Sequence, residues 1–357
     1  MENAEVLRTF HLFRGKSGAT MKESLEGLLP ACKSFLERIA AEGSGLRWSK
    51  VFLSDIVNQQ ELFQDSTLYK DILSKAACTV VGQPPLDGSR ITILAMSGPG
   101  DGLLFHSLRL TEEEARGKDS YAQTLLLFRK YIALIGEKGL ALEHDCIRTW
   151  LYVSDIDNNY SGVVRARNDL FKEHGLTRET HFVASTGIDG KSPAKGAVVS
   201  MDFLTLPDAK DIRYLHAPDH LNPTHEYGVA FERGSLVSFG GSRTVLISGT
   251  ASIDEKGRIL HEGDVLRQAG RLLENIAALL AEGGMTLSDI RHFIVYLRDI
   301  ADYPALHEYM AARFPATPSV IVNAPVCRPG WLVEMECCAE KSEFFFRKMH
   351  SLFRKKS

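Results

Sequence analysis

The alternation of apolar and polar positions repeats along this chain. Three β-rich runs, each ending in Asp-Ile, have nearly the same pattern: 46–56 (LRWSKVFLSDI), 147–156 (IRTWLYVSDI) and 290–300 (IRHFIVYLRDI). Each run follows a stretch with apolar residues at helical spacing that stops at glycine. Because a whole order of elements recurs, and not one short motif, the pattern predicts internal repeats.

The helical stretches carry their own start and stop signals. The third begins at Asp264, a favourable N-cap residue, and ends at Gly283–Gly284. We expect each Asp-Ile to be followed by a shorter helix and then two strands. The boundaries expected for the other two long helices are Ser24 and Ala41 in the first copy, and Asp119 or Ser120 with Gly136 or Gly139 in the second.

The closing strands of the copies complete a fold prediction. They cover 90–96, 197–203 and 331–337, and they are rich in Val, Ile, Leu and Met. The order hairpin, helix, strand, helix, two strands buries a sheet under two helices. The sequence therefore predicts an α+β protein of three tandem units, with an insert at about 210–226. The expected units are 1–96, 97–209 and 210–357.

Composition narrows the classes of function. The 357 residues are 44% hydrophobic and 24% charged, which is typical of globular proteins. The net charge of −3 argues against a nucleic-acid binder with a basic face and favours a small-molecule substrate. No apolar run reaches membrane-spanning length, and the first residues lack the order of a signal peptide. We expect a cytoplasmic protein without nucleic-acid or membrane partners.

Cysteine and histidine spacing does not predict a metal or cofactor site. The six cysteines form no CxxC pair and are expected to be reduced thiols. His216, His220, His225 and Glu226 lie close together but do not have the spacing of a helical zinc motif. The glycine-rich segment 97–102 lacks the lysine of a phosphate-binding loop and is typical of a hairpin turn. We expect neither a metal nor a cofactor.

The third unit resembles the RidA/YjgF family. The resemblance implies an α+β unit that assembles as a trimer with active sites between subunits. Three tandem units would then form a covalent pseudo-trimer, either monomeric or a small homo-oligomer. The matching segments are 246–253 (LISGTASI), 263–265 (GDV), 295–300 (VYLRDI) and 332–336 (LVEME).

The chain departs from the imine deaminases of that family at one position. Those enzymes hold the substrate carboxylate with an arginine about fifteen residues before the strand glutamate. Here the corresponding stretch, 316–319 (ATPS), has no arginine, although the glutamate remains as Glu334. Imine or enamine deamination is therefore an alternative, as is a non-catalytic ligand-binding protein of the same fold.

Longer motifs resemble the chorismatases, above all the bacterial 3- and 4-hydroxybenzoate synthases. The resemblance implies a cofactor-free enzyme that cleaves chorismate to pyruvate and a hydroxybenzoate for secondary metabolism. It leaves the choice of 3- or 4-hydroxybenzoate, or of a dihydrodiol, open. The motifs are 150–160 (WLYVSDIDNNY), 184–188 (ASTGI), 225–234 (HEYGVAFERG) and 324–336 (APVCRPGWLVEME).

Glu334 is the candidate general acid for this reaction. It alternates with apolar residues on a strand, so it can point into a partly dry pocket where burial raises its pKa and keeps it protonated. The second copy has Ser200 at the equivalent place, and the first has Thr92 or Ile93. A structural carboxylate is the alternative, with Glu336 as the next candidate acid.

The two carboxylates of chorismate call for cationic anchors, and guanidinium groups match carboxylates bidentately. Tyrosines are candidates for hydrogen bonds to a carboxylate or a ring hydroxyl, or else for packing. The candidate arginines are Arg298 and Arg328 from the third unit and Arg148, Arg165 and Arg167 from the second; the candidate tyrosines are Tyr152, Tyr160 and Tyr303.

Cys327 precedes Glu334 by seven residues. The chorismatase resemblance places it in the pocket and associates cysteine at this position with an aromatic product. From the residues alone, a buried inert thiol is equally compatible.

Overall fold

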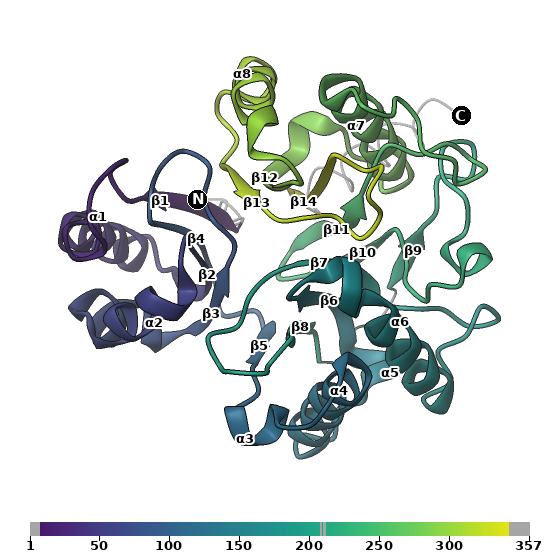
Figure 1. The fold of residues 1–357 in the computed structure, drawn as a ribbon, viewed down its shortest axis with the longest axis horizontal. Coiled ribbons are helices and arrows are strands. Elements are labelled where there is room, and N and C mark those ends of the chain that lie inside the picture. The colour runs from purple at the N-terminus through teal and green to yellow at the C-terminus, as the bar shows by residue number, and fades with distance from the viewer. Residues whose placement is uncertain (1–7, 208, 210–211, 343–357) are drawn as a thin grey trace, which may run out of the picture.

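The structure is a computed structural model that describes residues 8–207, 209 and 212–342. The outer ends of the first and third expected units, and most of the junction at 208–211, lie outside this range. Three β-sheets lie towards the middle, and most helices lie on the outside (Figure 1). The first sheet and its helices comprise β1 (Thr9–Arg14), α1 (Met21–Ala41), β2 (Gly45–Leu53), α2 (Ile56–Asp65), β3 (Ala77–Gly82) and β4 (Ile91–Gly98).

The second and third sheets follow in chain order. The second comprises β5 (Leu104–Leu108), α3 (Glu112–Ala115), α4 (Ser120–Gly136), α5 (Leu142–Asp145), β6 (Cys146–Val153), α6 (Ile156–Glu173), β7 (Ala184–Asp189) and β8 (Val199–Thr205). The third comprises β9 (Arg213–Leu215), β10 (Gly234–Phe239), β11 (Ser242–Thr250), α7 (Val265–Glu282), β12 (Ile290–Leu297), α8 (Tyr303–Arg313), β13 (Ser319–Asn323) and β14 (Val333–Ser342).

The same strand order recurs in all three sheets. It is β1-β4-β2-β3 in the first, β5-β8-β6-β7 in the second and β11-β14-β12-β13 within the third. In each, the last pair is parallel and the others are antiparallel. The prediction that each unit opens with a hairpin was wrong for the first and second sheets. Among the described residues, only the third sheet has a hairpin, β10–β11, before its long helix. Segment 97–102 is not a hairpin either, because β4 and β5 belong to different sheets.

The strand registers identify equivalent positions. Tyr296 pairs with Glu334, Tyr152 with Ser200, and Phe52 with Thr92. The expected equivalence of Ser200 to Glu334 is confirmed, and Thr92 is the first-sheet counterpart. Each of these strand pairs also has a register shift just before Trp48, Arg148 and His292, which precede Phe52, Tyr152 and Tyr296 by four residues. A bulge conserved in place across three sheets aims these three side chains in equivalent directions.

Both faces of each sheet are covered. Separate apolar clusters lie under the helices of the first and second sheets, whereas the largest cluster joins residues of all three sheets. β4, β6 and β8 are consequently buried at every position. This double burial explains why the strands read as nearly continuous apolar runs, and it requires every inward polar side chain to find a partner.

Helix boundaries follow the capping signals with two corrections. Asp264 and Asp119 cap α7 and α4 as expected, each accepting a backbone hydrogen bond. Helix α1 begins three residues earlier than expected, because Thr20 and Glu23 form a capping box. The helix after the second Asp-Ile is not shorter: α6 has 18 residues and α4 has 17.

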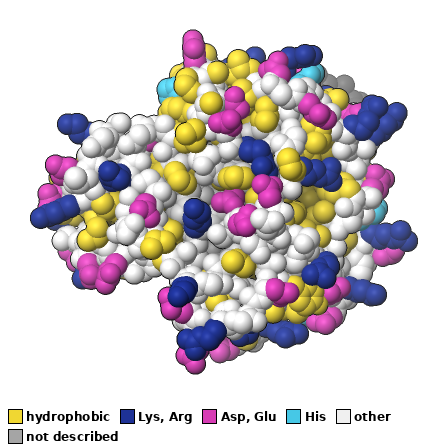
Figure 2. All heavy atoms as spheres, viewed as in Figure 1, with side chains coloured by type: hydrophobic (Ala, Val, Ile, Leu, Met, Phe, Trp, Pro, Cys, Tyr) yellow, Lys and Arg dark blue, Asp and Glu magenta, His cyan; other side chains and the backbone are white. Residues whose placement is uncertain are grey.

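The surface shows no segregation of charge on the face drawn in Figure 2. Lys and Arg side chains alternate there with Asp and Glu over all three lobes. No helix among the described residues is both long enough and apolar enough to cross a membrane.

Candidate active site

A cavity of about 340 Å³ lies between the second and third sheets, and we call it the inter-sheet cavity. Helix α6 and strand β7 form its wall on the side of the second sheet. Strands β11 and β14, the segment 227–233 and the loop before β14 form the other side. The volume is of the size that holds a small organic ligand.

Glu334 of β14 is the acid of this cavity. Its side chain is 5% exposed, and no hydrogen bond or ion pair joins its carboxyl group to another described residue. The carboxyl group lies against the backbone of Gly249, where a Cβ atom would be 2.1 Å from Glu334 Oε1. Burial, followed by the nearby Glu336, raises the pKa of Glu334 to about 8. The group is thus a protonated acid at neutral pH.

Four arginines line the same cavity, and none is paired with a carboxylate of the described chain. Arg167 is 1% exposed, and its Nε and Nη2 have no hydrogen-bond partner. Arg233 donates from Nη2 to Asn222 O at 2.9 Å, but its buried Nε is unpartnered. Arg328 lies 4.6 Å from the Tyr227 ring centroid, and Arg165 lies nearer the surface over Tyr121. Buried unpaired guanidinium groups indicate an anionic ligand.

Cys327 and Tyr160 complete the wall beside Glu334. Burial, with a smaller contribution from Glu334, raises the pKa of the Cys327 thiol to about 12, so the thiol is protonated at neutral pH. Tyr160 lies over Gly187, where a Cβ atom would be 2.8 Å from the tyrosine ring. The glycine is therefore what allows the ring to reach the cavity.

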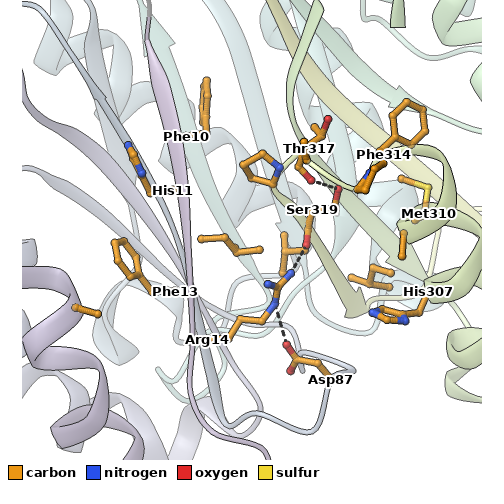
Figure 3. A pocket seen from close by; sticks show the side chains of 18 of the residues that line it. Phe10, His11, Phe13, Arg14, Asp87, His307, Met310, Phe314, Thr317 and Ser319 are labelled. Carbon is orange, nitrogen blue, oxygen red and sulfur yellow. Dashed lines mark hydrogen bonds and ion pairs between the residues drawn. The ribbon is translucent and has the colours of Figure 1, made fainter. Parts of the chain in front are cut away.

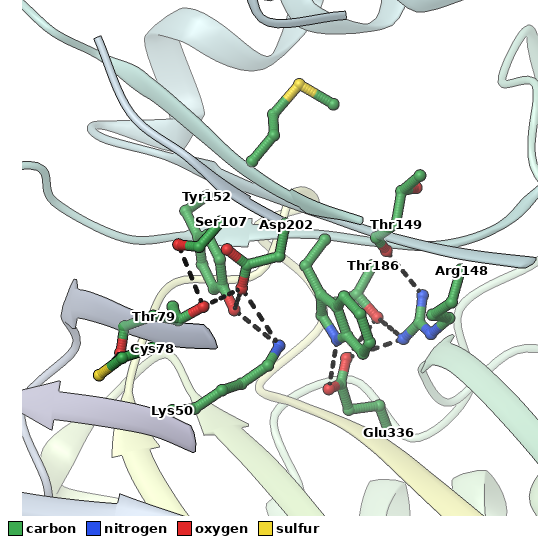
Figure 4. A network of polar contacts seen from close by, with 12 residues as sticks. Lys50, Cys78, Thr79, Ser107, Arg148, Thr149, Tyr152, Thr186, Asp202 and Glu336 are labelled. Atoms are coloured by element: carbon green, nitrogen blue, oxygen red, sulfur yellow. Dashed lines mark hydrogen bonds and ion pairs between the residues drawn. The ribbon is translucent and has the colours of Figure 1, made fainter. Parts of the chain in front are cut away.

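Arg148 and Tyr152 do not line the inter-sheet cavity. Both are fully buried between the sheets, in the polar network of Figure 4. Arg148 forms an ion pair with Glu336 at 2.9 Å, and the hydroxyl of Tyr152 donates to Asp202 at 3.0 Å. Lys50 donates to Tyr152 Oη at 2.8 Å. Their polar atoms are occupied by protein partners, which leaves them no substrate contact.

Arg298 and Tyr303 also lie outside the cavity. Arg298 makes two hydrogen bonds to Asp157, at 3.0 and 2.8 Å, and a third to Val326 O. It fastens the loop before Cys327 to the start of α6. Tyr303 lines a larger groove of about 930 Å³, the outer groove, between β1 and α1 on one side and α8 and β13 on the other (Figure 3).

The outer groove lacks the chemistry of the cavity. Its Arg14 is paired with Asp87 at 3.2 Å and donates to Ser319 O at 2.7 Å (Figure 3). Burial and the nearby Arg38 lower the pKa of its His11 to about 4. No acid with a raised pKa lines it among the described residues.

The histidine-rich insert forms no metal cluster within the described ranges. His216 is exposed and faces Glu232 at 3.6 Å, and Asn222 donates to Glu226.

Six candidates named from the sequence line this cavity, and other lining residues were missed. The six are Glu334, Cys327, Arg328, Arg165, Arg167 and Tyr160. Arg233, Tyr227 and Thr186 lie within the quoted motifs 225–234 and 184–188. No spacing distinguishes them from surface residues, since they converge only when the second and third sheets meet.

The chain is similar to several known proteins. The family model described as endoribonuclease L-PSP matches residues 225–341. A RutC family protein of Pyrococcus abyssi is 32% identical over 136 residues, which are 37% of this chain and 98% of that protein. The chain belongs to the RutC family.

Two further similarities extend beyond the third sheet. The 3-hydroxybenzoate synthase of Streptomyces hygroscopicus is 27% identical over 211 residues, 53% of this chain and 62% of that enzyme, so less than two thirds of that relative is matched. The crystal structure of a chorismatase superposes with a TM-score of 0.66 at 20% identity, over 94% of this chain and 98% of that one. The expected resemblance to the chorismatases is confirmed. The present chain shares the fold of the chorismatase structure along 94% of its length.

Replacing Gly249 with alanine should displace the Glu334 carboxyl group. The new Cβ atom would overlap Oε1 at 2.1 Å, so the carboxyl group must move towards the arginine-lined cavity, where its pKa falls. Titration of ¹³C-labelled glutamate carboxyl groups by NMR should show a lower midpoint for Glu334. Gly270→Ala, whose Cβ meets only Tyr309 Oη at 3.5 Å, is the matched control. An unchanged midpoint in Gly249→Ala would contradict the tight packing.

Proposed function

We propose that the protein is a chorismatase that converts chorismate to pyruvate and a hydroxybenzoate. The observation that carries the proposal is a protonated acid, Glu334, in a small cavity with four arginines that lack carboxylate partners. Chorismate is a dianion with an acid-labile enolpyruvyl ether, and both features fit this set of groups. The similarity to a 3-hydroxybenzoate synthase and to a chorismatase structure supports the same substrate.

In the proposed mechanism Glu334 donates its proton to the methylene carbon of the enolpyruvyl group. The ether carbon becomes an oxocarbenium ion, to which a water molecule adds to form a hemiketal. The hemiketal expels the ring oxygen, which takes a proton, and pyruvate and a ring diol are released. Loss of one water molecule from the diol then gives the hydroxybenzoate. The atoms of pyruvate and a hydroxybenzoate together equal those of chorismate, so no oxidant or reductant is consumed. Arg167 and Arg233, the most deeply buried of the four arginines that line the cavity, are the proposed carboxylate anchors.

We infer that the chain forms a covalent pseudo-trimer. The recurring strand order and the bulge at equivalent positions support three related units. Because β4 ends at Gly98, the proposed first unit extends two residues beyond the expected boundary at 96. The cavity then lies at one of three junctions between units. At this junction β14 carries Glu334 at the position where β8 has Ser200 and β4 has Thr92.

Glu334→Gln should lower the turnover number for chorismate cleavage by about 10²-fold or more, because an amide cannot donate the proton. Pyruvate release can be followed with lactate dehydrogenase. Glu274→Gln, on the exposed face of α7, should retain full activity. If the unmodified protein releases no pyruvate above the uncatalysed rate, the proposed function is wrong, and imine substrates become the next test of a deaminase.

Arg233→Met should raise the Michaelis constant for chorismate by about 30-fold, since a charge-assisted hydrogen bond contributes roughly 2 kcal/mol. Arg178→Met, at an exposed arginine that pairs with Glu179 outside the cavity, is the control and should change it less than 3-fold, within the scatter expected for an exposed ion pair. Steady-state kinetics of both variants checks this. Equal constants for Arg233→Met and the unmodified protein would remove Arg233 as an anchor.

Cys327→Ala should change the product without stopping cleavage. The thiol lies beside the acid but is not the acid, so pyruvate release persists. The space and polarity around the ring change, and we expect a shift from hydroxybenzoate towards a dihydrodiol or another isomer. Chromatography at matched conversion measures the ratio of the organic products. Cys32→Ala, at a buried position of α1, is the control. An unchanged ratio would make Cys327 a packed thiol.

A further inference from the structure

Two glutamates on β14 face the same way but have opposite surroundings. Glu334 and Glu336 are two residues apart on a strand, so their side chains leave the same face, about 7 Å apart along it. Glu334 faces the inter-sheet cavity without a hydrogen-bond partner, as described above. Glu336 is 2% exposed and lies in the polar network behind the cavity (Figure 4).

Among the described residues, the groups that form hydrogen bonds with the Glu336 carboxylate all donate to it. Its Oε2 accepts from Arg148 Nη2 at 2.9 Å and from Thr186 Oγ1 at 2.5 Å, and its Oε1 accepts from Trp150 Nε1 at 2.7 Å. The hydroxyl of Thr186 also accepts from Arg148 Nη2 and from the Gly249 N–H at 2.9 Å. Those two groups only donate, so the single Thr186 hydrogen is directed at Glu336. Glu336 is therefore held as an anion.

The network also reaches the acid through the backbone. Thr186 binds the amide of Gly249, and Gly249 is the surface against which the Glu334 carboxyl group lies. The network of Glu336, Arg148 and Thr186 thus places a negative charge behind Glu334 and holds the Gly249 backbone against which the Glu334 carboxyl group packs.

We propose that Glu336, held ionised by Arg148, Thr186 and Trp150, is a positioning residue whose negative charge keeps the proton on Glu334. The inference deepens the proposed function, which uses that proton, but the proton can be measured without any substrate.

The charges around Glu334 show why such a residue is needed. Burial and Glu336 raise the pKa of Glu334, whereas Arg148 and Arg233 lower it. Without Glu336, burial alone would oppose the effect of these cations on the carboxyl group. A unit charge at about 7 Å in protein surroundings shifts a pKa by roughly one to two units. Among the described residues, the other titratable groups around Glu334 are Arg165, Arg167 and Tyr160 from α6, Tyr296 from β12, Tyr227 from the segment before β10, and Cys327 and Arg328 from the loop before β14.

The second sheet supplies a matched network without an acid. Strand registers place Asp202 where β14 has Glu336, and Ser200 where it has Glu334. Asp202 accepts from Thr79 Oγ1 at 2.8 Å and from Arg109 at 3.1 Å, and it lies 3.6 Å from Lys50. Asp202→Asn therefore removes a comparable buried anion that does not act on Glu334.

The first test is the pH dependence of kcat/KM for chorismate. Glu334 works when protonated, so activity falls as the pH rises through its pKa of about 8. Glu336→Gln should move this limb to lower pH by one to two units, whereas Glu336→Asp and Asp202→Asn should leave it in place.

The second test needs no substrate. In protein with ¹³C-labelled glutamate carboxyl groups, the Glu334 signal is assigned by its loss in Glu334→Gln and is then titrated by NMR. Glu336→Gln should lower its midpoint by the same one to two units. The double variant Glu336→Gln/Arg148→Met removes both charges, avoids an unpaired buried cation and should return the midpoint towards that of the unmodified protein.

The outcomes separate the two hypotheses. A shifted titration in a protein that does not cleave chorismate would reject the proposed function and retain the role of Glu336. An unchanged midpoint in Glu336→Gln would overturn the role of Glu336. A midpoint that stays low in the double variant would overturn it too, because the effect would then be one of packing rather than charge. If Glu336→Gln does not fold, Arg148→Met and the double variant replace it: they differ only in the charge of Glu336, so the Glu334 midpoint should be roughly one to two units lower in the double variant, and equal midpoints would overturn the role of Glu336.

Discussion

The double burial of the sheets is the constraint on which the rest of the structure depends. Helices cover one face of each sheet, and the other two sheets cover the second face, so a polar group on an inner face outside the inter-sheet cavity cannot reach water. The Arg148–Glu336 ion pair satisfies this constraint between the second and third sheets. Removing one partner of such a pair costs about 3–5 kcal/mol, because the other charge is left buried. The pair stabilises the junction only as a complete unit.

The same constraint is met differently at the three junctions. Where the second and third sheets meet, Thr186 and Glu336 are in contact, and where the first and second meet, Thr79 and Asp202 are. The registers place Val320 and Leu94 at the corresponding positions of the remaining junction, which is apolar there. Equivalent backbone positions thus hold a threonine and a glutamate, a threonine and an aspartate, or two apolar residues. Only the junction between the second and third sheets combines a buried anion, Glu336, with an acid, Glu334, on the same strand.

The inter-sheet cavity favours proton donation over nucleophilic attack. Glu334 and Cys327 are buried beside each other, and burial raises the pKa of both. A protonated thiol is a weak nucleophile, whereas a protonated carboxyl group near neutral pH is an efficient acid. The arginines can hold an anionic ligand at any working pH, because guanidinium groups stay charged. Binding and acid chemistry are therefore assigned to different residues of one cavity.

Much of the local structure was determined by the sequence alone. The long helices end at their glycines and two begin at the expected caps, because capping acts within a few residues. Strand alternation was sufficient to aim Glu334 inwards, and the repeats identified Ser200 as its counterpart. The start of α1 was missed although the signal, Thr20 followed by Glu23, is local.

Only the tertiary structure decided what each inward side chain meets. Arg148, Arg298 and Arg167 all look like carboxylate anchors in the sequence, yet the first two are occupied by Glu336 and Asp157, and the third faces the inter-sheet cavity. The reason is physical. The direction of a side chain follows from the pleat of its own strand, but its partner comes from another sheet more than a hundred residues away, and no local pattern records how the two sheets meet.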